Sequence, residues 1–159
     1  MALTVAIAPL AVALTGGHAH AQAEDDLREG DRYFDDGNWR KAAASYDTAI
    51  RKYPGQVPVG AYAKRAAIFL ILKDSQGGLN FLEKTAIPRY PNATELLEQE
   101  ALLLWQAGRK ADAVTVADKV VEQKPAAFSN QALIGEFYAG RDPGRATRAY
   151  EAYLQYRPA

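Results

Sequence analysis

Residues 30–54 read GDRYFDDGNWRKAAASYDTAIRKYP, and this segment carries the clearest fold signal in the chain. Its small and aromatic residues stand at helical spacing, at Gly30, Tyr33, Gly37, Trp39, Ala42, Tyr46 and Ala49. Intervals of three and four residues place side chains on one face of a helix. Gly37 marks a turn, and Pro54 stops the second helix because proline cannot continue it. The stretch predicts two closely packed helices, in which small residues permit the approach and aromatic residues fill the space between them.

Prolines recur along the chain at a longer, nearly regular interval. Pro54, Pro91, Pro125 and Pro158 are separated by 37, 34 and 33 residues. A recurring period of this length is typical of repeat architectures, in which one helix pair stacks on the next. The sequence after residue 23 therefore divides into four units, at about 24–56, 57–92, 93–126 and 127–159.

The first unit resembles the tetratricopeptide repeat (TPR), whose pattern has a small and an aromatic residue in the first helix, then Ala, aromatic, Ala and Pro in the second. The third unit carries matching residues at Ala101 and Ala113, and the fourth at Ala146 and Tyr150. The resemblance implies an all-α fold, an α-solenoid of about four helix pairs in a right-handed superhelix. A generic four-helix bundle or an unrelated helical array is the alternative.

The second unit matches least well. Leu79 and Glu83 stand where alanine and an aromatic residue are usual, and Pro88 is expected to end the second helix early. Gly77-Gly78 is interpreted as part of a turn.

Helix-start signals agree with the division into units. Asn38 is expected to cap the helix that begins at Trp39, and Asp142-Pro143 to start the last helix. Asn92-x-x-Glu95 predicts a capping box at the start of the third unit.

The N-terminus resembles a secretory signal peptide over residues 1–23. An apolar run over residues 2–14 is followed by the Ala-x-Ala pattern at 19–23, which predicts cleavage after Ala21 or Ala23. The run is too short for a membrane span, which needs about 20 residues. We therefore expect an exported protein, periplasmic or extracellular. The alternative is a buried N-terminal helix, which Pro9 and the Gly-Gly-His stretch disfavour.

Composition argues against several functional classes. The 19 basic and 19 acidic residues balance, so nothing attracts nucleic acid, although residues 24–36 contain seven acidic and two basic residues. The chain has no cysteine, and its two histidines, His18 and His20, lie in the predicted signal segment. No catalytic or metal-binding motif accompanies them. We therefore expect no enzyme activity, no metal and no cofactor.

A partner is expected in the groove that the TPR resemblance implies. In this family the first helix of each pair lines the concave face, and residues at i, i+4 and i+7 point into it. The candidate residues are Leu27, Asp31, Phe34, Lys64, Ile68, Ile71, Glu98, Leu102, Trp105, Gln131 and Tyr138, with Gly135 between the last two. The alternative is that this apolar stripe packs internally. Leu27 and Asp31 stand where some family members carry a Lys/Asn-rich carboxylate clamp, so a C-terminal EEVD-type ligand is not expected.

These features favour a non-catalytic scaffold in the cell envelope that holds a partner polypeptide. The alternative is the N-terminal repeat array of a larger or self-associating assembly protein. The last helix is rich in aromatic residues and has no polar capping helix after it, as solenoids need. We therefore expect the chain to continue past Ala159, or this edge to pair with a partner or a second copy.

Overall fold

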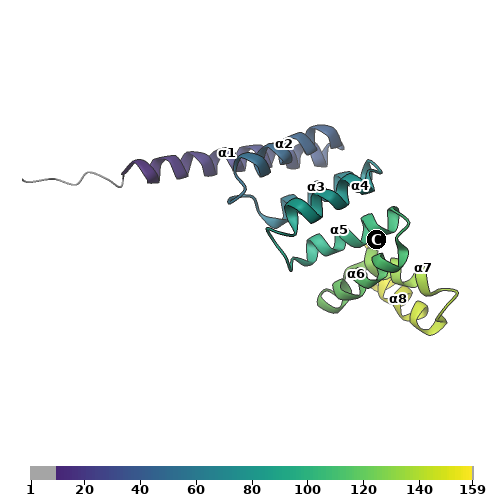
Figure 1. The fold of residues 1–159 in the computed structure, drawn as a ribbon. Coiled ribbons are helices and arrows are strands. Elements are labelled where there is room, and N and C mark those ends of the chain that lie inside the picture. The colour runs from purple at the N-terminus through teal and green to yellow at the C-terminus, as the bar shows by residue number, and fades with distance from the viewer. Residues whose placement is uncertain (1–9, 159) are drawn as a thin grey trace, which may run out of the picture. The chain divides into compact units, whose positions relative to one another are not determined.

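The computed structural model describes residues 10–158, and within this range every regular element is a helix (Figure 1). The elements are α1 (Leu10–Asp35), α2 (Trp39–Lys52), α3 (Val59–Ile71), α4 (Ser75–Phe81), the π-helix η1 (Leu82–Ala86), α5 (Thr94–Gln106), α6 (Lys110–Gln123), α7 (Phe128–Tyr138) and α8 (Pro143–Tyr156). The chain separates into two compact parts, which we call the N-terminal part (Met1–Pro58) and the C-terminal part (Val59–Ala159). The expected all-α fold of paired helices is confirmed.

The N-terminal part is one helix pair, α1 and α2. Gly37 joins the helices with φ +71°, a left-handed conformation that favours glycine. The Asn38 side chain accepts a hydrogen bond from the Lys41 amide at 3.4 Å, so the predicted cap is confirmed. Tyr46 is fully buried, and a Cβ added at Gly30 would lie 2.8 Å from its ring. A small residue at position 30 is therefore what lets the aromatic ring fit between the helices.

Helix α1 runs without interruption from Leu10, across Gly16 and Gly17, to Asp35. Midway along α1 the Tyr53 hydroxyl donates to Gln22 Oε1 at 2.8 Å, and Ala23 is only 1% exposed. The apolar run of the predicted signal peptide falls largely on residues 2–9, which lie outside the described residues. No helix that the structure describes has the length and apolar character to cross a membrane. Export stays a prediction.

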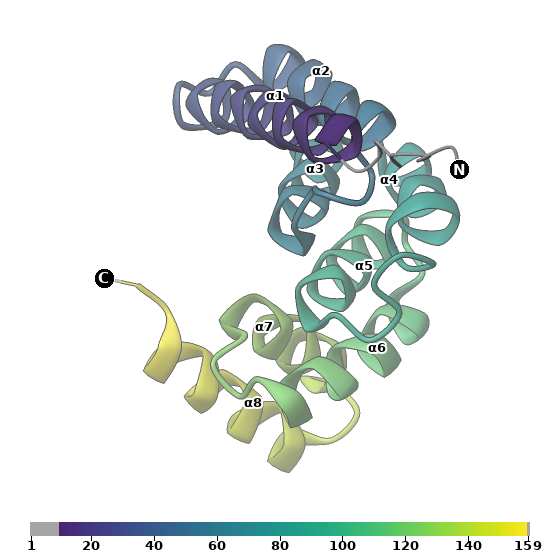
Figure 2. The ribbon, with the colours of Figure 1, turned by 90° about the vertical axis from the view of Figure 1, so that its left-hand side faces the viewer.

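The C-terminal part contains three helix pairs, α3 with α4 and η1, α5 with α6, and α7 with α8. Figure 2 shows α3, α5 and α7 following one another along the inner side of a curve, with α4, α6 and α8 outside. A buried cluster joins the last four helices and consists of Ala101, Val114, Ala117, Leu133, Ile134 and Ala149. Asp142 accepts a hydrogen bond from the Arg145 amide at 3.0 Å and Pro143 follows it, as predicted for the start of α8.

The second repeat unit is shifted by one residue from the sequence-based alignment. Asp74 caps α4 and accepts a hydrogen bond from the Gly77 amide at 2.9 Å. Counting from this cap as from Asn38, Gly78 takes the alanine position and Leu82 the aromatic position. Both are buried, whereas Leu79 is half-buried and Glu83 is exposed. The assignment of Leu79 and Glu83 to these positions was therefore wrong.

The prediction of a turn at Gly77-Gly78 was also wrong, because both glycines lie inside α4. A Cβ at Gly78 would lie 2.7 Å from Leu103 Cδ2 and 2.9 Å from Phe69 Cβ. This glycine permits a close helix contact and does not break the helix.

The π-helix η1 explains how the shifted unit still ends in the usual way. The Ile87 amide donates to the Leu82 carbonyl at 2.9 Å, a five-residue step that adds one residue to the turn. This extra residue brings Ala86 to full burial in place of the exposed Thr85. Pro88 follows at once, and the helix ends early as predicted.

The predicted capping box of the third unit is not formed. Helix α5 begins at Thr94 and its N-cap is Ala93, which makes no side-chain hydrogen bond. The Thr94 hydroxyl donates instead to Gln123 Oε1 at 2.6 Å, so this helix start is tied to the end of α6.

Candidate functional site

The inner face of the C-terminal part is the candidate site, because α3, α5 and α7 lie side by side along it (Figure 2). Helix α5 contributes the predicted residues Glu98, Leu102 and Trp105, each of which is half-buried. Leu102 and Trp105 pack on the core cluster with part of each side chain, so the site and the core share these residues. These α5 side chains are therefore partly packed and partly accessible, and the partner-binding groove stays a prediction.

Trp105 is contacted by a lysine from the second helix of its pair. The Lys110 ammonium lies 4.6 Å from the centre of the Trp105 ring and 3.6 Å from Glu136 Oε1 on α7. A cation against an aromatic face is stabilising by about 0.5–1 kcal/mol at an exposed site. At the other end of α5, Glu98 pairs with Lys124 at 2.6 Å. The apolar surface of α5 is thus bordered by charges that are already paired.

Helix α3 presents a different set of residues from the one predicted. Ile68 is fully buried, so its assignment to the groove was wrong. The reason is again the one-residue shift, which puts the half-buried Ala63, Ala67 and Leu70 at the positions that match Glu98, Leu102 and Trp105. Lys64 is half-buried beside them and Ile71 is 42% exposed at the end of the helix. The Gln106 side chain donates to the Leu70 carbonyl at 2.9 Å, which ties α5 to α3.

Helix α7 departs furthest from the prediction. Gln131 donates to the Pro125 carbonyl at 3.3 Å and lines a groove between α6 and α8, on the outer side. Gly135 is buried, with Tyr150 ring atoms 2.7 Å from where its Cβ would stand. Gln131 and Gly135 are therefore not part of the inner face. The turn before Asp142 has one residue more than the turn before Asn38, which explains the wrong register.

Tyr138 lies at the end of α7 and packs on the core cluster. The Arg145 guanidinium stands 4.1 Å from the centre of its ring, and the Phe137 ring makes an edge contact at 5.1 Å. Sequence reasoning missed Glu136, whose contact with Lys110 places it beside Trp105. The contact of Gly135 with Tyr150 matches that of Gly30 with Tyr46 in the first pair. Aligning the two contacts places Glu136 at the position of Asp31.

The three predicted residues of the N-terminal part lie on α1. Leu27 and Asp31 are half-buried, and Phe34 makes an edge contact with Trp39 at 5.2 Å. Asp31 accepts a hydrogen bond from the buried Tyr46 hydroxyl at 2.6 Å. Burial, and then this carboxylate, raise the pKa of Tyr46 above its ordinary value. Asp31 thus has a structural task within its own helix pair.

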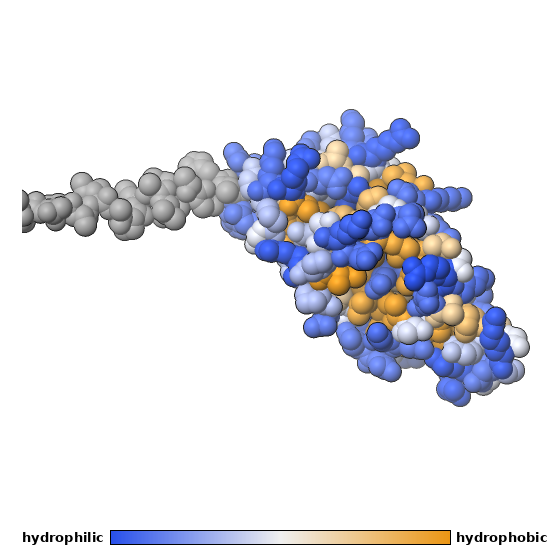
Figure 3. Space-filling model, in the orientation of Figure 1, coloured by the Kyte–Doolittle hydropathy of each residue, from blue (hydrophilic) through white to orange (hydrophobic). Residues whose placement is uncertain are grey.

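Some of the surface charges are paired, and apolar side chains lie between the charged ones. On the acidic helix α1, Arg28 pairs with Asp25 and Arg32 lies 3.9 Å from Glu29. Figure 3 shows apolar residues on this face over α3, α5 and α6, surrounded by hydrophilic ones. Among the residues that the structure describes, no three or more potential metal ligands lie together. The surface is suited to contact with another surface.

Comparison with known proteins identifies the fold and no nearer relative. No family model and no curated protein matches the sequence. Among solved structures, the chain is similar to the MamA RS-1 ArsTM double mutant with 16% identity, covering 84% of this chain and 74% of that one at a TM-score of 0.69.

Two further solved structures are similar. A tetratricopeptide repeat protein from Parabacteroides merdae has 18% identity over 85% of this chain and 53% of its own, with a TM-score of 0.69. The TPR2B domain of yeast Sti1, solved in a complex with pHsp70, has 23% identity over 86% of this chain and 99% of its own, with a TM-score of 0.56. The chain therefore has the fold of the tetratricopeptide repeat proteins.

Proposed function

We propose that the protein is a non-catalytic scaffold that binds a partner polypeptide on the inner face of its C-terminal part. The observation that carries the proposal is the half-buried apolar surface that α3 and α5 contribute, with Ala67, Leu102 and Trp105 along it. Binding energy at protein interfaces concentrates on a few such residues, and tryptophan is prominent among them. The complex of the Sti1 domain with pHsp70 supports the proposal by likeness of fold.

The bordering charges suit an extended or helical segment better than a small molecule. Glu98 and Lys124 pair at one end of α5, and Lys110 and Glu136 pair at the other. A polypeptide can place apolar side chains between two such borders and satisfy its own polar groups at the rim.

We also propose that the protein works in the cell envelope after export. The support for this location is the sequence of the N-terminus, an apolar run followed by Ala-x-Ala. Its partner would then be a component of that compartment.

The test is selection from a phage-displayed library of random peptides on the full chain, followed by binding measurements with two inner-face variants. Trp105→Ala and Ala67→Glu should each weaken the selected peptides at least tenfold, because one removes an anchor and the other places a charge in the apolar surface. Thr147→Glu on α8, an exposed position, is the matched control and should leave affinity unchanged. Failure to select any peptide, or equal binding by all variants, contradicts the proposal.

A second candidate function is assembly of copies through α8. Tyr150, Leu154 and Tyr156 are 39%, 58% and 39% exposed, so this helix presents large apolar side chains. Exposed apolar side chains of this kind are often covered by a partner surface.

A further inference from the structure

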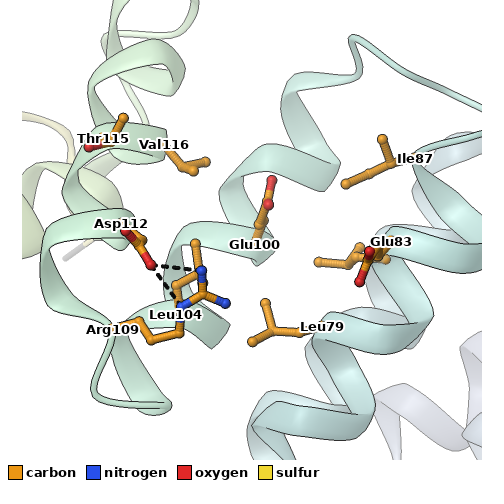
Figure 4. A pocket seen from close by; sticks show the side chains of 10 residues that line it. Leu79, Glu83, Ile87, Glu100, Leu104, Arg109, Asp112, Thr115 and Val116 are labelled. Atoms are coloured by element: carbon orange, nitrogen blue, oxygen red, sulfur yellow. Dashed lines mark hydrogen bonds and ion pairs between the residues drawn. The ribbon is translucent and has the colours of Figure 1, made fainter.

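A second cavity lies on the outer side of the C-terminal part, away from the inner face. It has a volume of about 500 Å³ and is bounded by α4 with η1, by α5 and by α6. Figure 4 shows Leu79 and Ile87 on one side, Val116 on the other and Leu104 between them. These apolar walls surround a small number of charged side chains.

Glu100 is the central charged group of this cavity. It stands on α5 between the two walls (Figure 4) and is half-buried. It makes no hydrogen bond or ion pair with any residue that the structure describes. Desolvation by burial raises the pKa of Glu100 above its usual range, although Lys119 and Arg109 act in the opposite direction. A carboxylate in this position is destabilising unless a cation or donor joins it.

The cation on the rim is already engaged elsewhere. Arg109 donates through Nε and Nη2 to Asp112 Oδ2, at 2.8 and 2.7 Å. This pair cancels its own charge, which leaves Glu100 and the exposed Glu83 as the unpaired charges among the lining residues, while Lys119 acts on Glu100 from outside the lining. The cavity therefore combines apolar walls with a net negative charge, and complements a group that is aliphatic along its length and cationic at its end.

In the neighbouring outer groove, a half-buried carboxylate is paired with an arginine of the chain itself. Between α6 and α8, Arg145 Nη2 lies 2.6 Å from both oxygens of Asp118, and each side chain is about one third exposed. In the preceding outer groove, where Glu100 lies, the position that matches Arg145, three residues after the N-cap of the later helix, is Asp112 on α6, so this groove lacks the corresponding arginine. Guanidinium groups are less strongly hydrated than ammonium groups and suit half-buried pairing.

We propose that the cavity between α4 and α6 receives one arginine side chain of a partner polypeptide, with the guanidinium on Glu100 and the aliphatic stem against Leu79 and Leu104. This inference rests on the proposed polypeptide binding and adds a second contact, on the opposite side of α5 from the inner face. It identifies the bound polypeptide as one with an exposed arginine.

The experiment pans a library of random peptides in parallel on the wild-type chain and on Glu100→Gln. The wild type should enrich arginine-bearing peptides that Glu100→Gln does not enrich. A selected peptide should lose at least tenfold in affinity when glutamine replaces Glu100, and equally when citrulline, a neutral isostere, replaces its arginine. The two changes together should cost little more than either alone, because both remove the same contact.

The control variant is Glu122→Gln, an exposed position on α6 outside the cavity, which should bind like the wild type. Thermal unfolding of Glu100→Gln should stay at or above that of the wild type, because the variant loses an unpaired half-buried charge. Binding that ignores Glu100→Gln or the citrulline replacement overturns the inference.

The inference and the proposed function can fail separately. If peptide affinity falls in Trp105→Ala but is unchanged in Glu100→Gln, the inner face is supported as a binding site and the arginine cavity is overturned. If no peptide is selected, the cavity can be tested separately. The protein is titrated with Nα-acetyl-argininamide, binding is followed by amide NMR shifts, and the citrulline analogue is the control. Shifts in α4, α5 and α6 for the arginine compound only support it, and their absence overturns it.

Discussion

At the scale of single residues, this fold depends on where small and large side chains meet. Gly30 and Tyr46 meet in the first pair, and Gly135 and Tyr150 meet in the last. In each case the ring atoms stand where a Cβ would be, at 2.8 and 2.7 Å. Tyr46 also needs a partner for its buried hydroxyl, and Asp31 provides it. Burial of an aromatic ring with a satisfied hydroxyl is the local source of stability.

Tyr46→Phe tests this contact. The variant loses the hydrogen bond to Asp31, so we expect a loss of about 1.5–3 kcal/mol in the free energy of unfolding, the usual range for hydrogen bonds to charged groups. Urea unfolding measures it. Tyr33→Phe is the control, because the Tyr33 hydroxyl has no hydrogen bond to another described residue, and it should change stability by less than about 0.5 kcal/mol.

The same pair predicts a pH dependence. The pKa of Tyr46 is raised in the folded state and is about 10 in the unfolded chain. Its contribution is therefore complete below about pH 10 and decreases as pH rises above that value. Urea unfolding at pH 9 to 11 should show a steeper loss for the wild type than for Tyr46→Phe. Parallel curves would contradict the assignment.

At the scale of elements, the second helix of the second unit shows how local irregularity serves packing. Helix α4 is short, contains two glycines and continues into η1. The glycine at 78 permits contact with Leu103 and Phe69, and the π-turn then restores the inward position of Ala86. Helix propensity alone would disfavour this segment, and tertiary contacts decide it.

Gly78→Ala should lower stability, whereas Gly60→Ala should not. Both glycines lie in helices, and alanine gains about 0.5–1 kcal/mol over glycine there. At position 78 the added methyl meets Leu103 Cδ2 at 2.7 Å, and overpacking costs about 1–3 kcal/mol. At position 60 nothing lies within 4 Å of the new Cβ. Thermal unfolding should fall for Gly78→Ala and stay level or rise for Gly60→Ala; a stabilised Gly78→Ala would show that α4 does not need the close contact.

At the scale of the whole molecule, the first helix bears on where the chain is processed and the last helix on whether copies associate. The middle of α1 combines the predicted processing sites with residues that belong to the fold, Gln22 and Ala23. The last helix has apolar side chains that no described part of the chain covers. Each question leads to one measurement.

We predict that processing, if the chain is exported as proposed, occurs after Ala21. Cleavage after Ala23 would remove the buried Ala23 and the hydrogen bond between Gln22 and Tyr53, whereas cleavage after Ala21 keeps both. Mass spectrometry of the protein from its native host should give Gln22 as the first residue. A chain beginning at Glu24 would contradict the choice of site, and recovery of an intact Met1 would contradict export.

We predict that the α8 surface supports self-association. Light scattering at micromolar concentration should show species larger than a monomer, and Leu154→Glu should remove them because it places a charge on the most exposed of the apolar side chains. Thr147→Glu, exposed on the same helix, should leave them unchanged. A monomer at every concentration would rule out this assembly.

The number and order of the helix pairs and the caps at Asn38 and Asp142 could be predicted from the sequence. These follow from local rules, because a cap, a helix period and a proline stop depend on neighbours in the chain.

Only the tertiary structure decided the register of the second and fourth units. The structure places Ile68 in the core and Gln131 in the outer groove, and not on the inner face. It also places Glu100 in a cavity. The reason is physical: one residue added to a π-turn or an interhelical loop rotates the face of a helix by about 100°, since 3.6 residues make a turn. Whether that residue is accommodated depends on contacts such as Gly78 with Leu103, which lie on different helices and leave no local pattern in the chain.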